Sequence, residues 1–248
     1  MNRILEMQVK SANEALGNLH LKDGYCCAKC NNKGVVYKAK ADELVAYICD
    51  CQRTRKSLRL LAQSGLIDII ERKSFDNFII KENWQKSLKE LCLDFLKQST
   101  DRTFFIGGQC GCGKTHLCTA MCAHYLTLGK SVRYFVWPRE IKTLKSFSND
   151  EKYDRYINEF ISADVLYIDD FLNQNQGCEP SGADINIAFE ILNARLCDIR
   201  KITLISSELT FSKLLLLDQG TISRIAEGAG KFLLNISQDE GKNFRLHI

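Results

Sequence analysis

The sequence is poor in proline, with two among 248 residues, and it contains no glycine- or serine-rich linker. No apolar run approaches the roughly 20 residues that a helix needs to cross a bilayer. The first residues alternate charged and apolar side chains and lack the apolar core of a signal peptide. We therefore expect a cytoplasmic protein without a membrane partner, built as one full-size domain with a small appendage.

Cysteine, by contrast, is plentiful, with twelve residues. A reducing compartment disfavours a disulfide framework, so these cysteines are expected to be metal ligands or small core residues. Four of them form two closely spaced pairs, Cys27 with Cys30 and Cys49 with Cys51. The 18 residues between the two pairs contain two strand-like runs. Paired thiolates joined by a hairpin are typical of a structural zinc site. Cys26 is an alternative to Cys27, although the spacing favours Cys27, and unligated cysteines are the alternative to a zinc site.

Positive charge is concentrated near the start of the chain. Residues 1–60 carry eleven Lys and Arg against six Asp and Glu, whereas the remaining residues carry 23 against 24. This asymmetry indicates an acidic or nucleic-acid partner for the N-terminal quarter. A solvated surface without a partner explains the same numbers.

The pattern of apolar residues predicts an α/β protein. Apolar spacing predicts helices over 2–19, 53–63 and 82–98. Five short apolar runs then alternate with helix-length segments: 103–107, 131–137, 164–169, 201–207 and 231–236. Strands separated in this way form a parallel sheet covered by helices on both faces. The boundary between the two domains is expected between residues 64 and 75.

The segment from Gly108 to Thr115 matches G-x-x-x-x-G-K-[ST], between an apolar run and a predicted helix. In such a loop backbone amides approach the phosphates of ATP or ADP, Lys114 contacts the β- and γ-phosphates, and Thr115 binds Mg²⁺. The expected nucleotide-binding residues are Gly108, Gln109, Cys110, Gly111, Cys112, Gly113, Lys114, Thr115 and His116. A metal site made from Cys110 and Cys112 is one alternative, but it would lack two ligands and would block the phosphates. A redox switch formed by these two thiols is another.

Polar residues at the ends of two later strands are candidates for catalysis. Asp169 and Asp170 follow a buried run, and we assign Asp169 to magnesium and Asp170 to activation of water. A strand that simply ends in a polar turn is the alternative. The next run ends at Ser206-Ser207-Glu208, where a polar residue could sense the γ-phosphate, and Ser207 and Glu208 are the candidates. Arg224 is a candidate arginine finger, or a surface salt-bridge residue.

The motifs together resemble the DnaC/DnaI type of helicase loader, whose ATPase core is shared with IstB transposition proteins. The matching segments are CAKC (27–30), FDNF (75–78), GQCGCGKTHL (108–117), VLYIDDF (165–171), FEILNAR (189–195), TLISSELT (203–210) and SRIAEG (223–228). The resemblance implies an AAA+ ATPase domain (67–248) without a C-terminal lid and a zinc-binding, helicase-interacting domain (1–66). It also implies a hexameric replicative helicase and single-stranded DNA as partners, self-association through the ATPase domain, and slow ATP hydrolysis stimulated by DNA or partner.

The resemblance further assigns individual residues. It implies that Arg224 acts on the nucleotide of a neighbouring subunit, that Phe75 and Phe78 lie near the adenine, and that Arg195 lies near the interface or the sensing network. Glu208 departs from the family, which often has asparagine at this sensor position, so hydrolysis is expected to be slow or Ser207 to carry the role. DNA contact is expected within 139–145.

Three other functions fit parts of the sequence. A transposition regulator would keep the ATPase and change the partner, but such proteins generally lack a zinc ribbon. A metabolic P-loop kinase would need an arginine-rich lid, which the sequence does not show. A zinc-dependent adaptor that binds ATP with little turnover is consistent with Glu208.

Overall fold

A computed structural model describes residues 3–64, 66–98, 100–147, 150–174 and 179–246. Five strands form one parallel sheet in the order β4-β5-β6-β3-β7. The strands are β3 (Thr103–Gly108), β4 (Val132–Val136), β5 (Val165–Asp169), β6 (Ile202–Ser207) and β7 (Leu233–Ile236). The predicted fold class, a five-stranded parallel α/β sheet, is confirmed.

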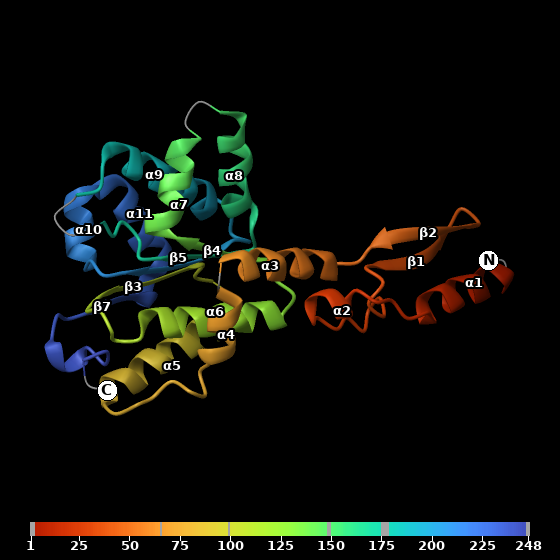
Figure 1. Ribbon diagram of the computed structural model, residues 1–248, viewed down its shortest axis with the longest axis horizontal. Coiled ribbons are helices and arrows are strands. Elements are labelled where there is room, and N and C mark those ends of the chain that lie inside the picture. The colour runs from red at the N-terminus through yellow and green to blue at the C-terminus, as the bar shows by residue number, and fades with distance from the viewer. Residues whose placement is uncertain (1–2, 65, 99, 148–149, 175–178, 247–248) are drawn as a thin grey trace.

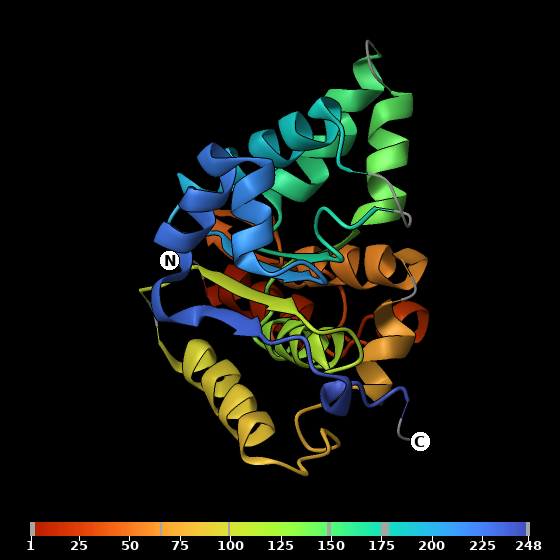
Figure 2. The same ribbon diagram turned by 90° about the vertical axis from the view of Figure 1, so that its left-hand side faces the viewer.

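Helices cover both faces of this sheet (Figure 1; Figure 2 shows the layers from the side). One face carries α4 (Leu66–Arg72), α5 (Asn83–Lys97) and α6 (Lys114–Thr127). The other carries α7 (Trp137–Ser146), α8 (Glu151–Ser162), α9 (Gly182–Leu196), α10 (Phe211–Leu217) and α11 (Gln219–Ala229). Alternate residues of β3 belong to two separate hydrophobic cores. Phe104 and Ile106 lie in the core on the first face, and Phe105 lies in the core on the second face. Burial on both faces explains why the strands read as continuous apolar runs.

Short 3₁₀ turns flank the last strand, η1 (Gly230–Phe232) before it and η2 (Glu240–Lys242) after it. None of the helices within the described residues combines the length and apolarity that crossing a membrane requires.

The chain before residue 51 extends away from the five-stranded sheet (Figure 1). This N-terminal module, residues 3–50, contains α1 (Arg3–Glu14), α2 (His20–Asp23) and an antiparallel hairpin of β1 (Val35–Lys40) and β2 (Glu43–Ile48). The expectation of one helix over 2–19 is wrong at its C-terminal end. The chain leaves the helix because the Gly17 amide donates to the carbonyl of Asn31 over 2.6 Å. A Cβ at Gly17 would lie 2.3 Å from the Asn32 carbonyl oxygen, so the close approach requires glycine.

Helix α3 (Cys51–Ser64) joins the module to the sheet. Its Ser57 hydroxyl accepts a hydrogen bond of 3.1 Å from the amide of Val132, the first residue of β4. Thr54 donates to the carbonyl of Gly129 over 3.0 Å, and Leu61 is fully buried in the core beside α6. Thus α3 begins in the cysteine cluster and is anchored on the sheet. A domain boundary within 64–75 stays a prediction.

Candidate functional site

The loop after β3 has the backbone shape of a phosphate cradle. Gly108 and Gly113 have φ angles of 108° and 96°, in the left-handed region that favours glycine. A Cβ at Gly108 would lie 2.0 Å from the Ile236 carbonyl oxygen, and one at Gly113 would lie 2.8 Å from the Phe78 ring. The buried Lys114 donates to the carbonyls of Gly108 and Gln109 over 2.8 and 2.6 Å. The loop therefore encloses the lysine that the motif assigns to the phosphates.

Asp169 lies beside this loop, at the end of β5, which β6 separates from β3 in the sheet. Its carboxylate accepts hydrogen bonds from Thr115 over 3.3 Å and from the Tyr134 hydroxyl over 2.7 Å. Ser206 of β6 also donates to it. Hydroxyl and carboxylate oxygens at this position are the donors that magnesium prefers, so the residues fit this ion. Tyr134 was not predicted because a tyrosine inside a buried strand looks like an ordinary core residue.

Asp170 has an uncommon backbone conformation and an altered acidity. Its φ angle is 55°, which turns the chain sharply after β5. Burial, together with the charges of Asp169 and Glu208, raises the pKa of Asp170 to about 6. A carboxylate that binds a proton more readily than usual is suited to accept one from an attacking water.

A pocket of about 360 Å³ opens over the loop. Its walls include Gly111 to His116, Phe78, Asp170 and Glu208, all of which the sequence assigned to the nucleotide site. Phe78 and His116 meet edge to face, with ring centroids 5.2 Å apart. Phe75 does not line this pocket and packs, partly buried, against the core. Of the two phenylalanines expected near the adenine, only Phe78 lines the pocket.

Six pocket residues were not assigned to the site from sequence: Lys73, Asn77, Ile79, Gln85, Phe244 and Arg245. The last two belong to the C-terminal segment, which crosses the loop through a 3.1 Å hydrogen bond from the Phe244 amide to the Gly111 carbonyl. Burial lowers the pKa of Lys73, and the nearby charge of Arg245 lowers it further. Two cations held this close to Lys114 make the pocket favourable for a polyanion such as a triphosphate.

The two candidates at the end of β6 differ in position. Glu208 lines the pocket and accepts a 3.3 Å hydrogen bond from the Asn173 amide group. The Ser207 hydroxyl donates to the Phe171 carbonyl over 2.8 Å and accepts from the Leu209 amide over 3.1 Å. Because backbone groups occupy this hydroxyl, Glu208 is the better placed of the two to face a bound phosphate.

The expectation for Arg195 is corrected by its position. Its guanidinium is 1% exposed and donates to five acceptors where β5 and β6 begin, at the opposite edge of the sheet from the pocket. Four of the five are backbone carbonyls, including those of Ala163 and Ile202. Such a buried and saturated side chain reaches neither a nucleotide nor a neighbouring subunit, and it ties α9 to the sheet. This role could not be predicted from the pattern of residues, because most of the partners are main-chain atoms.

Arg224 lies on the surface of α11, outside the pocket of its own chain. It donates to the Asn193 side chain, and its guanidinium lies over the Phe189 ring at 5.5 Å from the centroid. Phe189 is itself 43% exposed. An arginine that acts on the site of a neighbouring subunit has to be exposed in this way, so the geometry fits the expected role.

The loop cysteines do not form a metal site of their own. Cys112 is buried and donates to the Gln109 carbonyl over 2.9 Å, and burial raises the pKa of its thiol. Among the described residues, only Cys27, Cys30, Cys49 and Cys51 are gathered as metal ligands could be. A buried thiol of raised pKa is also a poor redox switch, because the thiolate is the reactive form.

The four N-terminal thiols fit zinc. Their sulfur atoms all lie within 4.8 Å of one another, with 3.9 Å between Cys27 and Cys49 and 3.6 Å between Cys30 and Cys51. Tetrahedral zinc with bonds of about 2.3 Å requires sulfur atoms about 3.8 Å apart. The Gly34 amide donates to the Cys30 sulfur over 3.3 Å, as amides do beside bound thiolates. Cys26 is exposed and lies outside the cluster, so the structure favours Cys27 as the ligand.

Comparison with known proteins agrees with this geometry. A family model described as "IstB-like ATP binding protein" matches residues 23–218. The uncharacterized protein YqaM of Bacillus subtilis (strain 168) is 33% identical over 77% of this chain and 63% of its own length. The phage-like element PBSX protein XkdC of the same bacterium is 30% identical over 86% of this chain and 82% of its own length. The chain thus spans less than two thirds of YqaM.

Among solved structures, the crystal structure of the DnaC helicase loader superimposes with a TM-score of 0.58. The match covers 68% of this chain and 98% of that one at 18% identity, so it concerns the fold.

Proposed function

Because the chain belongs to the IstB-like ATP-binding protein family, we propose that it loads a hexameric replicative helicase onto single-stranded DNA and hydrolyses ATP in doing so. The observation that carries this proposal is the pairing, on one chain, of a nucleotide pocket with a cluster of four thiols. The N-terminal module projects from the sheet (Figure 1). The fold shared with a DnaC helicase loader supports the proposal. The N-terminal module would contact the helicase, and the ATPase domain would self-associate.

In the nucleotide site, the loop amides and Lys114 bind the phosphates, while Thr115 and Asp169 would hold magnesium. Magnesium bound there would neutralise charge that develops on the phosphates. Asp170 orients water and takes its proton. Tyr134 keeps Asp169 in position through the 2.7 Å hydrogen bond. Lys73 and Arg245 add positive charge on the open side of the pocket.

Replacement of Arg245 tests whether the C-terminal segment takes part in nucleotide binding. We expect Arg245→Ala to bind ATP about tenfold more weakly, since a charge-assisted hydrogen bond contributes roughly 1.5–3 kcal/mol. Titration calorimetry on the full chain measures this loss. Arg59→Ala, at an exposed arginine of α3, is the matched control and should bind as the wild type does. Equal affinity of the two variants for ATP would show that Arg245 does not contribute to nucleotide binding.

Arg224 tests assembly through the ATPase domain. We expect Arg224→Ala to bind ATP normally in dilute solution, because Arg224 lies outside the pocket of its own chain. Its hydrolysis rate should no longer rise with protein concentration, because the neighbouring subunit supplies no guanidinium. Phosphate release measured over a concentration series, with Arg59→Ala as control, checks this. A concentration dependence like that of the wild type contradicts the assignment.

A second candidate, a regulator of transposition, is favoured by the family match itself. That match spans residues 23–218, which include the four cysteines. The two functions differ in partner. Co-purification with the replicative helicase of the host supports the loader, whereas binding to a transposase in its place supports the regulator.

A further inference from the structure

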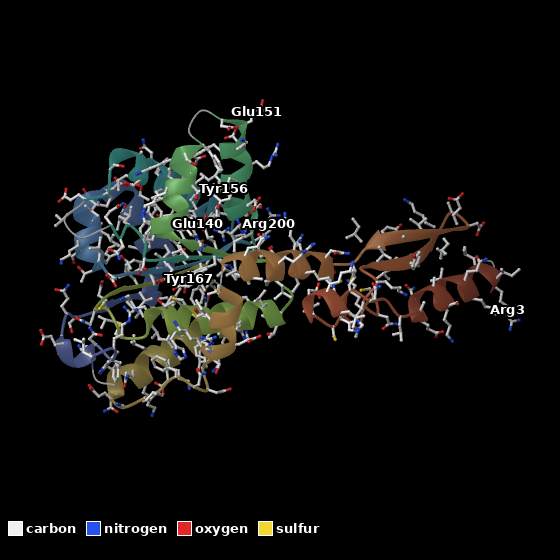
Figure 3. All side chains as sticks on the ribbon, in the orientation of Figure 1. Arg3, Glu140, Glu151, Tyr156, Tyr167 and Arg200 are labelled. Atoms are coloured by element: carbon white, nitrogen blue, oxygen red, sulfur yellow. The ribbon has the colours of Figure 1, made fainter. Side chains whose placement is uncertain are left out.

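A second, larger cleft lies at the edge of the sheet where β4, β5 and β6 begin. Its volume is about 940 Å³, and none of the residues that line it belongs to the nucleotide pocket. Its walls are α3, α8, the segment before β4 and the turn before β6. Figure 3 labels Arg200, one of the residues that line the cleft, near the end of the ATPase domain from which α3 extends. Parallel strands place their beginnings and ends at opposite edges, so the two sites are well separated.

The cleft is strongly basic. Seven cationic side chains and two acidic ones line it, an excess of five positive charges. The whole chain has an excess of four, so the rest of the molecule carries a net charge of minus one. The cations are Arg53 and Lys56 of α3, Lys130 and Arg133 beside or in β4, Arg155 of α8, and Arg200 and Lys201 before β6.

The acidic groups of the cleft are already engaged. Asp164 lies 3.6 Å from Arg53 and accepts hydrogen bonds from Ser131, while Glu159 lies 3.0 Å from Arg133. Four of the cations, by contrast, form no ion pair with any described carboxylate: Lys56, Lys130, Arg155 and Lys201. The Lys201 ammonium donates instead to the Ser162 carbonyl. Burial lowers the pKa of Lys201, and the charge of Arg195 lowers it further. The cleft thus holds seven positive charges together, and four of them have no carboxylate partner within the described residues.

The stretch 139–145, expected from sequence to contact DNA, is less suitable than the cleft for binding an anionic strand. Arg139 pairs with Glu140 at 2.7 Å, and Lys145 pairs with Asp184 at 2.6 Å. Its net positive charge is therefore largely neutralised within the chain, and Lys142 alone of its basic residues has no described ion pair.

The lining of the cleft indicates what kind of anion it would bind. No aromatic side chain is among its lining residues, so it offers no surface on which a base could stack. An acidic peptide would bring amide N–H groups that need acceptors, and the two carboxylates are already occupied by Arg53 and Arg133. A phosphodiester backbone brings acceptors alone, which suits lysine and arginine donors.

We propose that this cleft binds the phosphate backbone of single-stranded nucleic acid without reading its sequence. The choice of a single strand rests on the proposed function, whereas the recognition of phosphate rests on the cleft. Helix α3 gives the site a further role. Arg53 and Lys56 lie two and five residues after Cys51, the last cysteine of the cluster, on the same helix. A strand in the cleft therefore contacts the same helix that carries the helicase-binding module.

The test uses the full, zinc-loaded chain and fluorescence anisotropy with a labelled oligodeoxythymidine over a series of salt concentrations. In the cleft variant Lys56→Gln, Lys130→Gln and Arg155→Gln are combined. The matched control combines Lys86→Gln, Lys97→Gln and Lys213→Gln, which remove the same charge from exposed positions on other surfaces. We expect the cleft variant to bind at least about tenfold more weakly, with a salt slope shallower by about two, because each lost phosphate contact removes about 0.7.

Two results would overturn the inference. The first is an equal loss in the cleft and control variants, which would mean that only the total charge matters. The second is displacement of the oligonucleotide by polyglutamate at equal charge concentration, since an acidic protein segment would then be the ligand. Helicase binding is measured on the same samples. If only the cleft variant loses DNA binding and the wild type binds no helicase, the cleft is a nucleic-acid-binding site and the proposed loader function is wrong.

Discussion

Removal of zinc is expected to unfold the N-terminal module while the ATPase sheet stays folded. The module has almost no apolar core, since the cluster around its cysteines buries Cys30, Cys49 and Cys51 with only Tyr25, Cys27 and Val36 packed against them. The side chains of the hairpin are largely exposed. An isolated two-stranded hairpin is marginally stable at best in water. Zinc in a four-thiolate site contributes about 10–16 kcal/mol in comparable small domains, which is enough to decide whether the module folds.

Hydrogen exchange is the measurement that resolves this effect along the chain. With a strong chelator, or in Cys30→Ser, the amides of 35–48 should exchange at once. The amides of 103–108 should stay protected, because α3 remains attached to the sheet through Ser57 and Leu61. ATP affinity should be unchanged in the same samples.

Two cysteine variants serve as controls. Cys26 and Cys197 are exposed and lie outside the cluster, so Cys26→Ser and Cys197→Ser should keep one zinc ion and a protected hairpin. Cys27→Ser should behave as Cys30→Ser does. A protected hairpin in metal-free protein would mean that the four thiols serve another purpose.

The second large effect concerns Lys114. We expect Lys114→Ala to lower the rate of ATP hydrolysis at least roughly 10²-fold, the scale found when one group that stabilises transition-state charge is removed. The reason is the position of the side chain, which is 7% exposed and enclosed by the carbonyls of Gly108 and Gln109. No other described lysine lies inside the loop, although Lys73 lines the pocket above it. Steady-state phosphate release on the full chain measures the rate.

Two further variants make this result interpretable. Lys97→Ala removes an exposed lysine of α5 and should hydrolyse ATP as the wild type does. Asp170→Asn should bind ATP but not turn it over, because the amide cannot accept a proton from water. If Lys114→Ala loses the loop structure, Asp170→Asn still tests the site. Hydrolysis at the rate of the wild type in both variants would place the chemistry elsewhere.

The sheet and the phosphate loop could be predicted because their signals are local. Strands buried on both faces read as apolar runs, and the loop needs glycine where φ is positive, as at Gly113. The cysteine cluster was predictable for a similar reason, since ligand spacing along the chain reflects the geometry of the metal.

Features that depend on contacts between residues far apart in the sequence could not be predicted from it. The C-terminal segment has no helical or strand period, yet it brings Arg245 to the pocket by hydrogen bonding to the loop. Arg195 looked like a functional arginine because its carbonyl partners leave no trace in the sequence. The basic cleft joins residues near 53, 130, 155 and 200, and only the fold brings those four segments together. Helix α1 ended early because of Gly17, whose close contact is with Asn32.

The central claim is that this ATPase engages a replicative helicase through its zinc module. The most direct measurement is co-elution of the zinc-loaded chain with the hexameric replicative helicase of its host in the presence of ATP. We expect the wild type and Lys97→Ala to form a complex with the helicase. We expect Cys30→Ser to form none, even though this variant still binds ATP. Absence of a complex for wild-type protein that binds and hydrolyses ATP would contradict the claim.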